Sequence, residues 1–151
     1  MLNALKKRVK NEKGLTLIEL LAVVVILGII AAIAIPSIGG LIDNSKKDAH
    51  VANATQMINS AKTYVASNPN IDTMDIKLET LISEGLIDDM EDPDSGAKNY
   101  KKDTSLVSIT KNAATDTTAA SYSYSVTLVG SERNITDVAL DDLSRSSVED
   151  N

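Results

Sequence analysis

The pattern of polar and apolar positions divides the start of the chain into a basic segment and a long apolar run. Residues 20–42 form a run of 23 residues without a charged side chain, rich in Leu, Ile, Val and Ala. At about 1.5 Å of rise per residue, a helix of this length spans the roughly 30 Å hydrocarbon core of a membrane. Residues 1–14 carry five Lys or Arg residues against one acidic residue, a balance that keeps this flank cytoplasmic.

After the apolar run, the pattern becomes that of a one-sided helix. Apolar residues recur at alternating spacings of three and four, which places them in one stripe: Val51, Ala54, Ile58, Ala61 and Val65. The sequence Ser67-Asn68-Pro69 is a typical helix stop. We therefore predict one helix from about Thr16 to Ala66, apolar all round in its first half and amphipathic in its second.

Three residues depart from the apolar pattern in the first half of this helix. Glu19 places a carboxylate near the start of the apolar run, and a charge costs about 2.5–3.5 kcal/mol at the centre of a membrane helix. Gly28 lowers helix propensity by about 1 kcal/mol, and Pro36 removes a backbone donor. We predict that the segment 28–36 is the weakest part of the helix, and that Glu19 has a partner.

The remaining residues, 68–151, predict a small domain of mixed structure. A short helix over Ile76–Ser83 is stopped by Gly85. Alternating or β-branched segments predict strands over 106–110, 122–128 and 135–140. Polar segments predict loops over 88–96, 111–120 and 130–134. The polar segment 141–151 predicts a frayed tail. The predicted fold class is α+β, a long N-terminal helix packed through its stripe against a small antiparallel sheet.

Charge and composition exclude several functional classes. The net charge is −6, and beyond residue 14 ten basic residues face twenty acidic ones, which argues against nucleic-acid binding. The absence of cysteine excludes disulfides and thiolate metal sites. His50 is the single histidine, too little material for His-based catalysis, and we predict that it is a solvated helix residue. We expect no enzymatic activity and no cofactor.

Four carboxylates in the polar loop are weak candidates for calcium ligands: Asp88, Asp89, Asp92 and Asp94. Calcium prefers oxygen ligands, but the loop lacks the full spacing of an EF-hand. A solvated turn is therefore the favoured interpretation of this loop, and a calcium site is the alternative.

The segment around Glu19 matches a known arrangement: Lys13-Gly14-Leu15-Thr16-Leu17-Ile18-Glu19-Leu20-Leu21. It resembles the processing site of type IV prepilins and pseudopilins. The resemblance covers about the first 65 residues, and the stretch 78–93 more loosely resembles secretion-type pseudopilins. Leu15 stands where the family usually has Phe. The chain also lacks the cysteines with which many pilins close a C-terminal loop, so hairpin pairing or a bound ion must hold that loop.

The resemblance implies a pilin fold and a division of the chain. Residues 1–14 are a leader that a prepilin peptidase removes after Gly14, and the same enzyme methylates the new amine of Leu15. Residues 15–42 form the transmembrane and filament-core half of the helix, residues 43–67 its amphipathic half, and residues 68–151 the globular domain.

The resemblance also implies partners and locations. The precursor crosses the cytoplasmic membrane once, and an assembly platform with its ATPase then builds a helical homopolymer that becomes a filament at the cell surface. Glu19 of one subunit meets the Leu15 amine of its neighbour, which penalises wrong registers because a slipped subunit buries both charges alone. The helix loosens between Gly28 and Pro36 in the filament.

Several functions share this N-terminus. The leading interpretation is a major subunit of a type IV pilus. The alternative is a pseudopilin of a type II secretion or DNA-uptake machine, and a minor alternative is a single-span membrane-anchored binding protein. An ordinary signal peptide cut after Ala34 is a further rival. The N-terminus of the mature protein separates them, because it is Leu15 for a pilin, Ile35 for a signal peptide and Met1 for a plain anchor.

Overall fold

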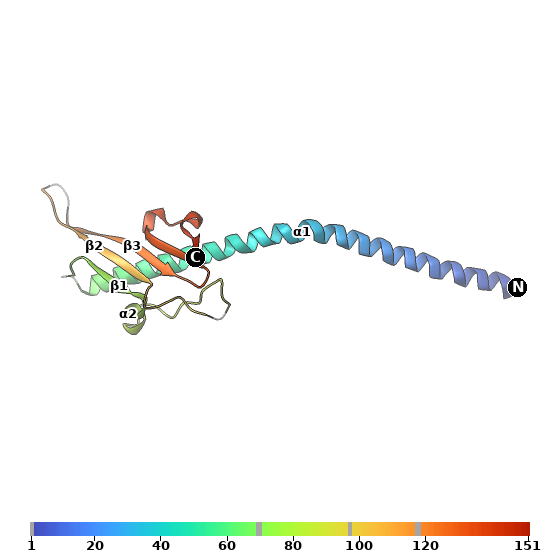
Figure 1. Cartoon of the computed structure of the whole chain (residues 1–151), viewed down its shortest axis with the longest axis horizontal. Helices are drawn as coiled ribbons and strands as arrows, with labels where there is room; N and C mark the ends of the chain where they lie inside the picture. The colour runs from blue at the N-terminus through green and yellow to red at the C-terminus, as the bar shows by residue number, and fades with distance from the viewer. Residues whose placement is uncertain (1, 69–70, 97, 117–118) are drawn as a thin grey trace. The chain divides into compact units, whose positions relative to one another are not determined.

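The computed structural model describes residues 2–68, 71–96, 98–116 and 119–151, with side chains from residue 16 onward. The chain divides into two compact units, Met1–Asp43 and Asn44–Asn151. Helix α1, Leu2–Ser67, begins in the first unit and ends in the second (Figure 1).

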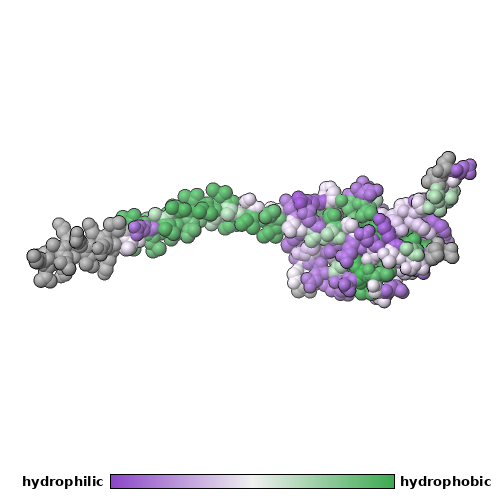
Figure 2. Space-filling view, turned by 180° about the vertical axis from the view of Figure 1, so that it is seen from behind, coloured by the Kyte–Doolittle hydropathy of each residue, from purple (hydrophilic) through white to green (hydrophobic). Residues whose placement is uncertain are grey.

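Helix α1 confirms the predicted long helix and extends it at its N-terminal end. The prediction began the helix at about Thr16, whereas α1 begins at Leu2 and ends at Ser67. Pro36 lies inside the helix, which continues through it. In the first unit, the side chains from residue 16 onward are almost all exposed, and Figure 2 shows the nearly continuous apolar surface that they form.

The second unit is built around a five-stranded antiparallel sheet in the order β1-β2-β3-β4-β5. Its strands are β1 Met74–Lys77, β2 Leu106–Asn112, β3 Ser121–Val129, β4 Arg133–Ala139 and β5 Glu149–Asp150. Helix α2, Leu78–Ser83, follows β1 directly, and two 3-10 turns, η1 Leu140–Asp142 and η2 Arg145–Ser147, lie between β4 and β5. Each strand pairs with the next one along the chain, so the sheet contains no crossover between its described strands.

The amphipathic half of α1 packs in the core of this unit, as its stripe predicts. Ala54, Ile58 and Ala61 are fully buried, Val65 is buried and Val51 is half-buried. They share one buried cluster with the inward-facing strand residues Val107, Ile109, Val126, Leu128 and Ile135. The predicted α+β fold is therefore confirmed.

The first strand corrects the prediction of a helix over residues 76–83. Ile76 is 1% exposed and pairs with Val107 of β2, so residues 74–77 form an edge strand, and the helix begins only at Leu78. Four residues are too few to reveal a strand by alternation, and the pairing partner lies about thirty positions away. The predicted helix stop is confirmed, because Gly85 takes a φ of +69° just after the helix.

The C-terminal tail is ordered, which makes the prediction of a frayed end wrong. Strand β5 pairs with the start of β4, the Asn151 N–H donates to the Glu132 carbonyl, and Val148 is buried. Arg145 donates from Nε and Nη2 to the two carboxylate oxygens of Asp48, at 2.5 and 2.6 Å. The same pairing shortens the predicted 130–134 loop, because β4 already begins at Arg133. Strand β2 likewise extends to Asn112, inside the loop predicted from residue 111.

Candidate functional site

The first unit presents an apolar helix surface with one carboxylate near its start. From Leu17 to Ile42 the large apolar side chains are between 51% and 72% exposed, and Glu19 is exposed among them. In the described part of the chain, one helix is long and apolar enough to cross a membrane. A signal sequence near the N-terminus would meet the same criterion.

The residues predicted to act in processing and assembly fall on this unit. Gly14 and Leu15, the predicted cleavage and methylation site, lie within the backbone of α1, and the side chain of Leu15 lies outside the described part of the structure. Gly28 has no neighbouring atom within 4 Å of where a Cβ would stand, and Pro36 is exposed. The roles predicted for Gly14, Leu15, Glu19, Gly28 and Pro36 stay predictions.

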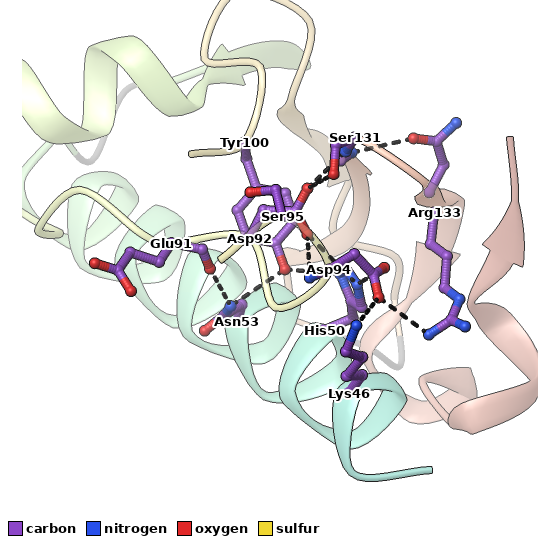
Figure 3. Close-up of polar contacts among 12 residues, drawn as sticks. Lys46, His50, Asn53, Glu91, Asp92, Asp94, Ser95, Tyr100, Ser131 and Arg133 are labelled. Carbon is purple, nitrogen blue, oxygen red and sulfur yellow. Dashed lines mark hydrogen bonds and ion pairs between the residues drawn. The ribbon is translucent and has the colours of Figure 1, made fainter. Parts of the chain in front are cut away.

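The second unit contains a polar cluster that the sequence did not predict, centred on His50. His50 is 1% exposed, so the prediction of a solvated histidine is wrong. Its Nε2 lies 2.9 Å from Asp94 Oδ2, and its Nδ1 lies 2.7 Å from the Tyr100 hydroxyl. Figure 3 shows these side chains, together with Arg133 at the start of β4, converging from helix α1, the 88–100 loop and the β3–β4 region. We call the cluster of Lys46, His50, Asp92, Asp94, Ser131 and Arg133 the loop clasp.

Donor and acceptor counts orient the imidazole of His50. The Asn53 amide donates to the Tyr100 hydroxyl oxygen at 3.2 Å, so the tyrosine proton is available for His50 Nδ1. With Nδ1 accepting, Nε2 carries the proton and donates to Asp94. The chain of hydrogen bonds therefore runs from Asn53 through Tyr100 and His50 to Asp94. Burial raises the pKa of the Tyr100 hydroxyl, which keeps this donor protonated.

Asp92 ties the polar loop to the β3–β4 turn. Its Oδ2 accepts from the Ser131 N–H at 2.6 Å and from the Ser131 hydroxyl at 2.7 Å, and its Oδ1 accepts from the Asp94 N–H at 2.9 Å. Burial by itself raises the pKa of the Asp92 carboxyl. The hydrogen bonds from Asp94 and Ser131, with a smaller contribution from His50, outweigh burial and leave the pKa lowered.

Asp94 ties the same loop to two cations. Lys46 Nζ lies 3.4 Å from its Oδ1 and Arg133 Nη1 lies 3.3 Å from the same oxygen, while His50 occupies Oδ2. Asp92 is buried, the side chain of Asp94 is 3% exposed, and both carboxylates have partners, which overturns the solvated-turn interpretation for these two residues.

The clasp contains residue types that bind metal ions, but their surroundings fit ion pairing better. His50, Asp92 and Asp94 offer ligand atoms within 4.8 Å of one another. A divalent cation there would have to displace Lys46 and Arg133, two positive charges already on Asp94. These three residues are therefore not assigned as metal ligands.

The other two weak candidates for calcium ligands lie apart from the clasp. Asp88 and Asp89 are exposed, and Asp89 pairs with Lys102 at 2.5 Å. The solvated-turn interpretation holds for Asp88 and Asp89.

Gly130 lets the turn approach the clasp. A Cβ added to Gly130 would lie 2.6 Å from the Arg133 carbonyl oxygen and 3.0 Å from Asp92 Oδ2. The first distance is too short for a carbon atom and involves a backbone oxygen, and the second is tight. A side chain at this position would therefore push the turn away from Asp92.

Replacing Gly130 with alanine is expected to destabilise the second unit by about 2–3 kcal/mol through overpacking. Gly96→Ala is the matched control, because Gly96 has a φ of +62° but no atom within 4 Å of a Cβ, and it should cost only about 1 kcal/mol. Thermal unfolding of both variants measures the difference. Equal losses would show that the close contacts of a Gly130 Cβ with the Arg133 carbonyl and Asp92 do not affect stability.

Acid is expected to unfold the second unit through the clasp. Because the folded pKa of Asp92 is lowered, its stabilisation is complete above the unfolded pKa, and it is lost as pH falls through the folded pKa. The melting temperature should therefore be flat from pH 7 to about pH 5 and fall below about pH 4. In an Asp92→Asn variant the melting temperature should fall less steeply with decreasing pH. An unchanged slope would mean that other carboxylates cause the loss of stability in acid.

Part of this clasp had a signal in the sequence. The Asp92-Pro93-Asp94 segment forms a turn in which the Asp92 side chain accepts from the backbone N–H two residues on, a known habit of aspartate. The partners His50 and Ser131 carry no such signal, because they lie about forty positions away on either side.

Comparisons with known proteins bear on the first unit and part of the second. Residues 9–35 match the model of the prokaryotic N-terminal methylation motif. That range includes Gly14, Leu15, Glu19 and Gly28, and it ends one residue before Pro36. No solved structure matches the chain.

Three curated relatives carry the same name, type II secretion system core protein G. The chain is 31% identical to the Vibrio cholerae protein over 78 residues, covering 52% of this chain and 53% of that one. It is 26% identical to the Escherichia coli K12 protein over 93 residues, covering 62% and 60%. It is 27% identical to the Klebsiella michiganensis protein over 77 residues, covering 51% and 54%. The matches therefore span only about half to three fifths of these relatives.

Three independent observations now agree. The N-terminal segment matches the methylation motif, the relatives are named type II secretion system core protein G, and the fold joins a long N-terminal helix to a small antiparallel sheet. Together they support a type IV pilin-like family for this chain.

Proposed function

We propose that this chain is a structural pseudopilin, a subunit that polymerises through its N-terminal helix into the filament of a secretion or DNA-uptake machine. The observation that carries the proposal is the combination of the methylation motif with similarity to type II secretion core protein G. The sequence favoured a major pilus subunit, but the names of the relatives support the pseudopilin instead. In this role the protein is structural and has no catalytic activity.

The exposed apolar helix supports polymerisation as the fate of the first unit. Outside a membrane, this many exposed Leu, Ile and Val side chains would aggregate unless other copies covered them. A helical homopolymer covers the apolar surface of each subunit with that of its neighbours. The proposed partners are further copies of the chain, a prepilin peptidase that also methylates Leu15, and an assembly platform with its ATPase.

The proposal includes a path through the cell envelope. The precursor spans the cytoplasmic membrane with its basic N-terminus inside, the peptidase cuts after Gly14, and the mature subunit leaves the membrane for a filament. The second unit faces outward throughout. Its ion-paired clasp performs the loop closure for which many pilins use cysteines, and the chain has none.

The N-terminus of the mature protein tests the proposal. In cells that contain the peptidase it is expected to be methylated Leu15, and Gly14→Leu should leave uncut precursor in the membrane. An N-terminus at Ile35 would identify a signal peptide, and Met1 a plain anchor.

Electron microscopy of sheared cells at native expression separates the two kinds of filament. Short or sparse filaments agree with a pseudopilin, whereas abundant long fibres would restore the pilus interpretation.

A further inference from the structure

Two hydrogen-bonding side chains interrupt the apolar run of the first unit, and they lie on one face of helix α1. Between Leu17 and Ile42, Glu19 and Ser37 are the two residues whose side chains can donate or accept a hydrogen bond. Their separation in the sequence corresponds to about five full turns of an α-helix at 3.6 residues per turn. Because α1 continues through both positions, Ser37 lies on the same face of the helix as Glu19.

The same segment has a backbone carbonyl that lacks its usual helical donor. Pro36 lies inside α1 and has no N–H, so the Ala32 carbonyl loses the donor that the residue four positions later normally supplies. Ala32 lies near the middle of the 20–42 run. In hydrocarbon no water replaces the missing donor, and an unsatisfied carbonyl costs several kcal/mol. A donor from another helix would remove this cost.

Ser37 has the group and the surroundings of such a donor. Within the second unit, hydroxyls of α1 donate to the carbonyl four residues earlier: Thr55, Ser60, Thr63 and Ser67. Among the described residues Ser37 makes no bond of this kind, and it is exposed. Ala34 and Gly40, three positions to either side, are small, so a second helix can approach closely enough to reach this short side chain.

We propose that in the polymer the Ser37 hydroxyl of one copy donates to the Ala32 carbonyl of the next, a second polar contact besides the pair formed by Glu19. At about 100° per residue, Ser37 and Ala32 lie about 140° apart around the helix. One two-fold pair of helices therefore cannot use both groups. A contact between two different faces is heterologous and links copies in an open series, as a filament requires. The inference rests on the proposed function, because it requires α1 to assemble with other copies.

The axial offset that this hydrogen bond needs agrees with the offset proposed for Glu19. Ser37 lies about 7.5 Å beyond Ala32 along the helix, and Glu19 lies about 6 Å beyond Leu15. In both contacts the later residue of one copy meets the earlier residue of a neighbour, so the two offsets have the same direction. A displacement of somewhat more than one helical turn therefore serves both contacts on the face that Glu19 and Ser37 share.

Cysteine cross-linking in assembled filaments tests this contact, because the chain has no cysteine of its own. Cells with the peptidase and the assembly machine co-express a Ser37→Cys copy and a tagged Ala32→Cys copy. Mild oxidation should link the two variants, since the contact brings their Cα atoms within the roughly 7 Å that a disulfide allows. A tagged Gly28→Cys copy, changed one turn before Ala32, is the matched control. It should link to the Ser37→Cys copy about tenfold less.

Substitution of Ser37 tests the hydroxyl itself. Ser37→Ala should lower the sheared filament fraction about threefold to tenfold, the effect of one hydrogen bond lost between membrane helices. Ser37→Thr, which keeps the hydroxyl, should assemble as the unmodified chain does. Cleavage after Gly14, checked by mass, should be unchanged in both variants.

Several outcomes would overturn the contact between Ser37 and Ala32. Equal linking of the Ser37→Cys copy to the Ala32→Cys and Gly28→Cys copies would contradict the offset. Efficient linking among Ser37→Cys copies alone would place this face against itself. Unchanged filaments from Ser37→Ala, or an equal loss in Ser37→Thr, would contradict the role of the hydroxyl. Absence of any filament from the unmodified processed chain would instead contradict the proposed function.

Discussion

Replacing Glu19 with alanine is expected to abolish filament assembly while leaving cleavage after Gly14 intact. In the proposed filament, the Leu15 amine of each subunit is buried beside the Glu19 carboxylate of a neighbour. Removing one member of a buried ion pair costs about 3–5 kcal/mol because the other charge stays buried alone. This loss recurs at every subunit, so even a fraction of it prevents growth. N-terminal sequencing checks cleavage, and the sheared filament fraction measures assembly.

The chain offers a matched control for this variant. Glu12 is the one acidic residue of the leader, and Glu12→Ala changes the same charge in a segment that processing removes. It should assemble as the unmodified chain does. Normal filaments from Glu19→Ala would refute the register role of this residue.

Replacing Asp92 with alanine is expected to cost the second unit about 3–5 kcal/mol, the second large effect. The substitution leaves the Ser131 N–H, the Ser131 hydroxyl and the Asp94 N–H without their shared acceptor. For a unit of about 100 residues, this loss corresponds to a fall in melting temperature on the order of 15 °C. Near-ultraviolet circular dichroism reports this unit selectively, because the four tyrosines lie within it and the chain has no Trp.

Asp88→Ala is the control for Asp92→Ala. It removes the same group from the same loop, but Asp88 is exposed, and its loss should change stability by less than about 0.5 kcal/mol. Similar melting temperatures for the two variants would mean that the clasp contributes nothing beyond ordinary loop charge. Asp92→Asn, which keeps the size of the side chain, should fall between them.

The loop clasp of the second unit and the apolar helix surface of the first unit meet different physical requirements. In the proposed filament, the first unit needs a smooth apolar surface with one fixed charge, and its long-range contacts would come from other copies. The second unit has a modest core, so directional contacts between distant residues add to its stability. In the described residues, Lys46 and His50 of α1 both pair with Asp94, about 45 positions away, and so join the helix to the loop.

Local patterns were enough to predict much of this molecule. The 3.6-residue period located the core stripe of α1, and the residue pairs 54/58 and 61/65 are buried as expected. Period-two alternation located β3, and Gly85 ended α2. These features depend on neighbours within a turn or a strand, so the sequence contains all the information that they need.

Long-range pairing decided what the sequence left open. Residues 74–77 become a strand because β2 offers them an edge, and the polar tail is ordered because β4 offers it another. His50 looked solvated because a lone histidine on a polar helix face usually is. Its burial follows from the Asp92–Asp94 loop folding over it, which no local pattern reveals.

By itself, the sequence determined that the chain carries an apolar helix with a carboxylate near its start and a processing motif before it. These features are visible in the sequence because signals for membrane insertion and for processing consist of short, contiguous segments. Only the tertiary structure decided how the second unit is held together, because ion pairs and buried hydrogen bonds join residues that are close in space and distant in the chain.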